Sequence, residues 1–257
     1  MTRRIGSSSR VRAAAGVVIA VAAGLSLAPP TSAGDLLPAE TVLARYAEAI
    51  GGEAVAKVKN IVAEFKFSMS SQGVYATGVE YWQAPGERYL RIDLAATGVP
   101  NFETGVSGDT AWQVHPLAGA SVLKGNEERE SLRAAHLNPF AVWQTFYETA
   151  ETAGEEVVRE KSCYRIVFTS AEGSPLHSYF DKDTGLLVRE EILGPTGPAI
   201  TRDLSDWQES QGIRSPRSVK QRGLQSYLVK FTNVSYDVDE IPEGTFEIPA
   251  SVKAALR

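Results

Sequence analysis

Apolar and polar residues alternate with a period of two along most of this chain. The clearest case is residues 61–69, where every second residue from Ile61 is apolar and the residues between are mostly polar. Such alternation places the apolar side chains on one face of a strand and the polar ones on the other. We therefore expect an inward face that carries Phe65, Phe67 and Met69 and a solvent face that carries Glu64, Lys66 and Ser68.

Ten further segments show strand patterns, and turn residues separate most of them. Gly108-Asp109 and the run from Asp181 to Gly185 are typical of tight hairpin turns. Short strands joined by tight turns predict an antiparallel meander of about eleven strands. The ten segments are residues 74–82, 88–94, 102–106, 111–115, 164–168, 176–180, 186–193, 200–208, 217–222 and 226–237.

Three segments have helical spacing instead. They are residues 38–50, 53–58 and about 126–146, the last interrupted at Asn138-Pro139. So few helices against so many strands predict one α+β domain, a single curved antiparallel sheet whose apolar face the helices cover. The second half of the third segment carries Phe140, Trp143 and Phe146 at spacings of three.

The first 33 residues predict export. Four arginines precede an uncharged, Ala- and Val-rich run from Ala13 to Ala28, and Pro29, Pro30 and the small residues Thr31-Ser32-Ala33 follow it. This order is typical of a secretory signal peptide cleaved after Ala33, and the run is shorter than the roughly 20 residues of a membrane-spanning helix. The residues after Arg3-Arg4 are not bulky and apolar, which favours general secretion over the twin-arginine route. We expect a soluble exported protein.

Charge and cysteine content narrow the classes of partner. The chain has 26 basic and 31 acidic residues; removal of residues 1–33, with four arginines and no acid, leaves 22 against 31. A negative surface argues against nucleic acid, and against anionic lipid headgroups, as partners bound by simple charge attraction. Cys163 is the only cysteine, so we expect no internal disulfide and a buried, structural thiol.

The sequence lacks the motifs that carry common enzyme chemistry. It contains no nucleophile elbow, zinc-protease pair, dinucleotide loop or Walker loop. His115, His136 and His177 are scattered without metal-ligand spacing. We expect no enzyme, cofactor or metal; a cleft joining His115 or His177 to a serine and an acidic residue would argue for catalysis.

Five short segments of the chain are GGEAVAKV at 51–58, YWQAP at 81–85, GDTAW at 108–112, CYRI at 163–166 and YFDKDTGLL at 179–187. Together they resemble the LolA-like family of periplasmic outer-membrane lipoprotein-sorting proteins, as an outlying branch. The resemblance runs from about Pro38 to Pro249. After the predicted signal peptide at 1–33, it implies a LolA-like lipid- or lipoprotein-binding domain at 34–249 and a short C-terminal tail at 250–257.

The resemblance implies an unclosed half β-barrel with a helical lid over its concave face and acyl chains in the cavity between them. Arg45 and Arg91 are candidates for the arginine that holds the lid closed in the family's carrier. The candidate ligand-binding residues are Phe65, Phe67, Met69, Leu90, Ile92, Trp112, Phe140, Trp143, Phe146 and Phe168.

The leading hypothesis is a monomeric periplasmic carrier for a lipid or an acylated lipoprotein, which also meets an inner- or outer-membrane partner protein. One alternative is a regulatory or scaffolding module that binds an envelope protein through the same groove or an exposed sheet edge. Another is that the large apolar residues pack only on one another, as an ordinary core.

Overall fold

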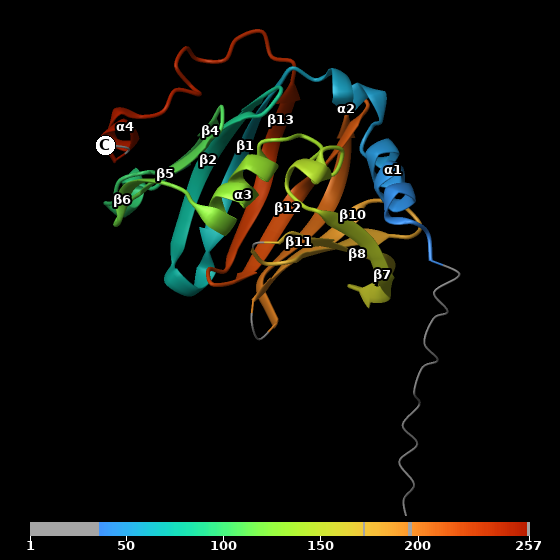
Figure 1. The fold of residues 1–257 in the computed structure, drawn as a ribbon. Coiled ribbons are helices and arrows are strands. Elements are labelled where there is room, and N and C mark those ends of the chain that lie inside the picture. Colours follow the sequence, from blue (N-terminus) through green and yellow to red (C-terminus); the bar gives the residue numbers. More distant parts are fainter. Residues whose placement is uncertain (1–35, 172, 195–196, 256–257) are drawn as a thin grey trace, which may run out of the picture. The chain divides into compact units, whose positions relative to one another are not determined.

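A computed structural model describes residues 36–171, 173–194 and 197–255, so the predicted signal peptide lies outside the described residues. The described residues form one antiparallel sheet of thirteen strands in the order β6-β5-β4-β3-β2-β1-β13-β12-β11-β10-β9-β8-β7 (Figure 1). The strands are β1 (Asn60–Met69), β2 (Val74–Gln83), β3 (Glu87–Asp93), β4 (Phe102–Ser107), β5 (Thr110–His115), β6 (Gly119–Val122), β7 (Thr149–Val158), β8 (Lys161–Thr169), β9 (Leu176–Asp181), β10 (Leu187–Gly194), β11 (Gly197–Ser210), β12 (Ile213–Gly223) and β13 (Tyr227–Tyr236).

The sheet confirms the predicted fold class of one large, unclosed antiparallel sheet with few helices. All neighbours are successive along the chain except β1 and β13, whose pairing joins the two halves. The sheet stays open because β6 and β7 are its edges. These two strands are the ones the sequence pattern missed, since β6 has four residues and the first eight residues of β7, TAETAGEE, include no large apolar one.

Four α-helices and three short 3₁₀ turns accompany the sheet in the described residues. They are α1 (Ala39–Ala49), α2 (Glu53–Lys57), α3 (Gly125–Ala134), α4 (Ala250–Ala255), η1 (Ser70–Gln72), η2 (Ala95–Thr97) and η3 (Trp143–Thr145). The first two match their predicted segments, and Gly51, at φ 129°, ends α1 in a conformation that favours glycine.

The third predicted helix is correct only in its first half. It ends at Ala134, and the segment that carries Phe140 and Phe146 is irregular apart from η3. The expected C-terminal tail contains α4, whose Val252 is wholly buried. In the described part of the chain no helix is long and apolar enough to span a membrane.

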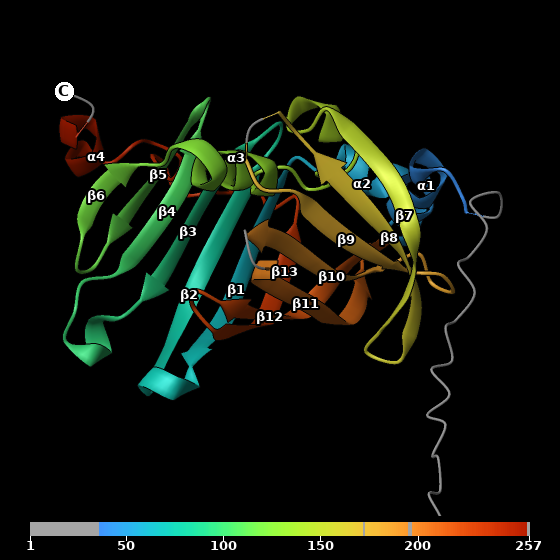
Figure 2. The ribbon, with the colours of Figure 1, turned by 60° about the horizontal axis from the view of Figure 1, so that its bottom comes forward.

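The sheet has two faces of different character. We call inner the face against which α1 and α3 pack, and outer the opposite face (Figure 2). In β1, Phe65 and Phe67 are buried on the inner face, while Glu64 and Lys66 are exposed on the outer face. The predicted alternation is therefore confirmed over these residues, and only Ser68 and Met69, at the end of the strand, are both half-buried.

Candidate functional site

Helices cover one half of the inner face. In this covered cluster Tyr46 of α1 meets Phe140 and Phe180 edge-on, with ring centroids 5.3 and 5.4 Å away. Phe140 in turn stacks on Phe168 at 5.6 Å. Aromatic rings at these separations are in direct contact, so side chains fill the space between α1 and this part of the sheet.

The other half of the inner face carries an apolar cluster without helical cover, which we call the open cluster. None of its described members lies in an α-helix. In Figure 2, α3 crosses near one end of β1–β4, and the opposite ends of these strands extend beyond it. The buried members are Phe65, Phe67, Ile92 and Leu94, and the half-buried members are Met69, Val74, Ala76, Leu90, Val99, Phe102, Tyr227, Val229 and Phe231.

The absence of a side chain at Gly78 lets Phe65 pack against the sheet at the base of the open cluster. Gly78 of β2 lies opposite Phe65 of β1, and the Phe65 ring lies over it. A methyl group at position 78 would overlap this ring and would lie 2.6 Å from the Arg91 carbonyl oxygen. The Phe65 ring can therefore lie flat on the sheet, where Phe231 meets it with centroids 5.9 Å apart.

A buried ion-pair network holds α3 against the sheet between the two clusters. Arg133 of α3 donates from Nη1 to Glu190 of β10 at 2.9 Å and from Nη2 to Glu130 at 3.1 Å. Arg202 of β11 lies 3.6 Å from Glu130 and 3.8 Å from Glu190. The Tyr147 hydroxyl donates to Glu130 at 3.0 Å. Two cationic and two anionic groups thus balance one another beneath α3.

The network continues to the border of the open cluster. Arg202 donates from Nε to the Gln221 side-chain oxygen at 3.0 Å, and the Tyr227 hydroxyl donates to the same oxygen at 2.9 Å. The Tyr227 ring lies beside Phe67 in the open cluster, 5.5 Å between centroids. The apolar open cluster therefore borders the polar groups of Arg202, Gln221 and Tyr227. The Arg202 side chain is 26% exposed at this border.

The network fixes the charge state of its members. Burial raises the pKa of Glu130, but Arg133 and Arg202 more than offset this and hold it below its ordinary value. Burial lowers the pKa of Arg133, yet Glu130 and Glu190 raise it well above its usual range. Both groups are therefore charged at neutral pH, as a tightly paired buried network requires.

A second polar pair marks the same boundary on β2 and β3. Glu80 is 3% exposed and pairs with Arg88, while burial raises its pKa more than Arg88 lowers it. On β2, Ala76 belongs to the open cluster, Glu80 follows it, and Trp82 packs on the covered cluster. Trp82 also donates from Nε1 to the Ala134 carbonyl at the end of α3, 3.1 Å away.

The ten predicted binding residues fall into three groups. Five belong to the open cluster: Phe65, Phe67, Met69, Leu90 and Ile92. Four belong to or pack on the covered cluster: Phe140, Trp143, Phe146 and Phe168. Trp112 joins neither, because the register pairs it with Gly105 on the outer face, where it is 1% exposed. The structure therefore does not bring the ten together around one space.

Trp112 was predicted on the inner face, but the inner-face residue at this point of β5 is its neighbour Ala111. Ala111 is wholly buried, and Leu132 of α3 packs on the cluster that contains it. A small residue on the inner face lets α3 approach the strand closely. The larger side chain faces outward, where a Cβ at Gly105 would lie 2.6 Å from the Trp112 ring.

Neither predicted arginine holds a helix on the inner face. Arg45 is exposed on α1, and Arg91 is exposed on the outer face of β3. Arg133 has that role, and its pairing with a glutamate 57 positions along the chain gives no local sequence signal. The sequence also does not identify three members of the open cluster, Tyr227, Val229 and Phe231. Their alternation predicts a strand but does not show that this strand pairs with β1.

Two hollows in the described residues are lined by residues outside the open cluster. One, of about 420 Å³, is lined by Arg129, Gln144, Thr145, Phe146, Tyr147, Glu148, Ser170 and Ala171. The other, of about 290 Å³, is lined by Arg159, Lys161, Leu186, Leu187, Val188, Leu204, Ser205, Asp206 and Trp207. Phe146 is the one predicted binding residue among these linings.

The histidines have structural surroundings. His115 accepts backbone hydrogen bonds from Leu117 and Ala118, both at 3.2 Å, and His136 packs edge-on to Phe146. Burial, with Arg165 beside it, lowers the pKa of His177. Within the ranges that the structure describes, no three His, Cys, Asp or Glu residues are grouped so that they could hold a metal ion.

Comparison with solved structures identifies the architecture. A LolA superfamily protein from Nitrosomonas europaea matches with TM-score 0.57 and 10% identity, over 83% of this chain and 99% of that one. A DUF1329 family protein from Desulfovibrio piger matches with TM-score 0.58 and 14% identity, over 82% and 98%. An outer membrane lipoprotein-sorting protein domain from Vibrio parahaemolyticus matches with TM-score 0.55 and 11% identity, over 81% and 97%.

No family model and no curated protein matches the sequence. At these identities the structural likeness concerns the fold, and it confirms that this chain has a LolA-like fold. The function must therefore be argued from the inner face itself.

Proposed function

We propose that the protein is a periplasmic carrier that binds an acyl chain of a lipid or lipid-modified protein along the open cluster. The observation that carries this proposal is the apolar part of the inner face that has no helical cover. A contiguous apolar surface of this kind, bordered by polar groups, is typical of a ligand-binding groove. The predicted signal peptide and the lipoprotein-sorting domain among the structural matches support this proposal.

The energetics suit an unbranched chain. Burial of each methylene contributes about 0.8 kcal/mol, so a long acyl chain offers on the order of 10 kcal/mol before the costs of association. Leu90, Val229 and Phe231 are half-buried in the open cluster, so part of their apolar surface is still in water. A chain laid along them would remove that surface from water without needing polar contacts.

The polar border gives the ligand a direction. Arg202 is partly exposed where Gln221 and the Tyr227 hydroxyl meet, at one side of the open cluster. We place the polar group of the ligand beside Arg202 and its chain over Phe67 and Leu90. This arrangement selects an amphipathic ligand over a fully apolar one.

Fluorescence titration with a long-chain fatty acid probe tests the proposal. Val229→Glu and Leu90→Glu place a charge on the open cluster and should weaken binding at least tenfold. Val157→Glu is the matched control, because Val157 is 78% exposed on β7. Circular dichroism should show that all variants stay folded. A folded wild type without probe uptake, or a control that loses as much affinity as the groove variants, would contradict the proposal.

A second candidate function is the binding of an envelope protein through the sheet edge. One observation favours it: β7 is a ten-residue edge strand whose residues alternate between exposed and half-buried. Edge strands present unpaired backbone groups to an added strand. A wild-type protein that takes up no lipid but forms a stable complex with a protein partner would favour this function.

A further inference from the structure

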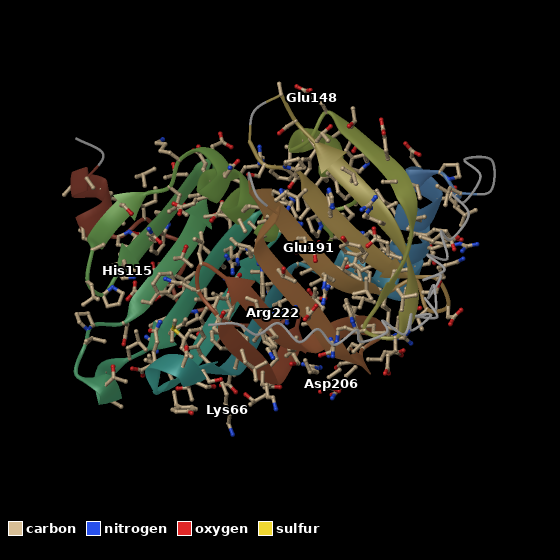
Figure 3. The ribbon with its side chains drawn as sticks, turned by 90° about the horizontal axis from the view of Figure 1, so that it is seen from below. Lys66, His115, Glu148, Glu191, Asp206 and Arg222 are labelled. Carbon is tan, nitrogen blue, oxygen red and sulfur yellow. The ribbon has the colours of Figure 1, made fainter. Side chains whose placement is uncertain are left out.

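A row of three lysines crosses the outer face of the central strands. Lys66 of β1 lies directly opposite Lys230 of β13. Lys220 of β12 lies opposite Leu228, which places it diagonally beside Lys230. All three are exposed, and among the described residues none forms an ion pair. We call them the lysine row; in Figure 3, Lys66 points away from the sheet.

The lysine row has no evident role in folding. Like charges directly opposite one another on neighbouring strands destabilise a sheet. Glu64 lies on the same face two residues from Lys66, yet the two do not pair. The nearby carboxylate of Asp203 is occupied by Arg189 and Arg222, at 2.7 and 2.6 Å. The positive charge of the row is therefore available to a partner.

Exposed apolar side chains border the lysine row at the end of the strands. Ser68, two residues after Lys66, lies opposite both Leu228 and Tyr75. Tyr75 is 66% exposed, and Leu224, in the turn between β12 and β13, is 86% exposed. We call these two residues, together with the half-buried Leu228, the apolar rim. The open cluster ends at the same place, where Met69 lies opposite Val74.

We propose that the lysine row and the apolar rim dock this end of the sheet on anionic lipid headgroups. Ammonium groups pair with phosphates at a membrane surface, and tyrosine and leucine side chains enter the boundary between headgroups and acyl chains. The rim residues lie singly at a strand end and a turn, which suits insertion between headgroups better than contact with a flat protein surface.

Local charge, rather than net charge, decides this contact. The chain carries a net charge of −5, and it has 22 basic against 31 acidic residues once residues 1–33 are removed, which disfavours attraction to an anionic surface at long range. Screening limits electrostatic interaction to about 10 Å at 0.1 M salt, so the residues nearest the membrane dominate. The purpose of docking rests on the proposed function. Docking would bring the end of the open cluster to the bilayer from which an acyl chain leaves.

Vesicle flotation tests the docking. The producing cell processes the protein, and all variants are purified with the same N-terminus. Each protein is then mixed with vesicles of phosphatidylethanolamine and phosphatidylglycerol, or with vesicles of phosphatidylcholine alone. We expect binding to the anionic vesicles only, weakened about fivefold for each lysine of the row replaced by serine. Leu224→Ser should weaken binding as well.

The control removes three other exposed lysines, as Lys57→Ser, Lys124→Ser and Lys253→Ser. It should bind anionic vesicles like the wild type. The row variant should keep its fatty acid uptake, which separates failed docking from a failed carrier function. Equal binding to both vesicle types, equal loss in the control, or binding of an acidic polypeptide but no vesicle would overturn the proposal.

Discussion

Arg133 of α3 and Glu190 of β10 form a buried ion pair with Nη1 and Oε1 2.9 Å apart. Their side chains are only 6% and 10% exposed, and they join α3, which packs on β4 and β5, to the other half of the sheet. The pair therefore holds α3 in place at the boundary between the covered and open clusters.

Arg133→Met should lower the free energy of unfolding by about 3–5 kcal/mol, because it removes one of the two cations that balance the buried Glu130 and Glu190. Urea denaturation measures this loss. The double variant Arg133→Met/Glu190→Leu should recover much of it, since it removes both charges. Lys57→Ala, which breaks an exposed pair with Glu53, should cost less than about 1 kcal/mol. A double variant as unstable as the single one would contradict this account.

Glu130 should make stability depend on acidity. Its pKa is lowered in the folded state, so its stabilising contribution is fully present above its ordinary pKa of 4.5 and is lost as the pH falls through the folded-state pKa. The stability advantage of the wild type over Glu130→Gln should therefore shrink below about pH 4.5. Thermal unfolding of both proteins between pH 3 and 7, at about one-unit steps, measures it. An advantage that grows on acidification would contradict the pairing.

Gly78→Ala should disturb the floor of the open cluster. The added methyl group overlaps the Phe65 ring and crowds the Arg91 carbonyl, which we expect to cost about 1–3 kcal/mol and to weaken fatty acid binding. Gly86→Ala is the control, because a Cβ there meets only His136 at 3.5 Å. If Gly78→Ala binds the probe as well as the control does, the position of Phe65 has no part in binding.

Cys163 should be unreactive in the folded protein. The thiol is wholly buried on the outer face, and burial together with Asp181 raises its pKa to about 11. A thiol reagent at pH 8 should label it only after unfolding in urea. Rapid labelling of the native protein would show that the packing of Val158 and Tyr179 around the sulfur is wrong.

The sequence predicted what local patterns determine. Alternation identified eleven of the strands and the inward face of β1, because each strand buries one side. It failed where burial depends on distant partners. Residues 140–146 carry large side chains at spacings of three, yet they pack into the covered cluster without forming an α-helix.

The candidate site was half predictable for the same reason. Phe65, Phe67 and Leu90 follow from alternation within their own strands. The division of the inner face does not, because Glu190 and Arg202 meet Arg133 only once α3 is placed over the sheet. The alternation of residues in β5 likewise does not determine which face of this strand meets α3. Trp112 was therefore predicted on the inner face, although it lies on the outer face.

Photo-crosslinking tests the central claim most directly. A long-chain fatty acid with a photoreactive group near its methyl end is bound, irradiated and located by peptide mass spectrometry. We predict adducts on the open cluster, in the peptides that carry Phe67, Leu90 and Val229. Adducts confined to the covered cluster around Phe140 and Phe168, or none on a folded protein, would contradict the binding of an acyl chain along the open half of the inner face.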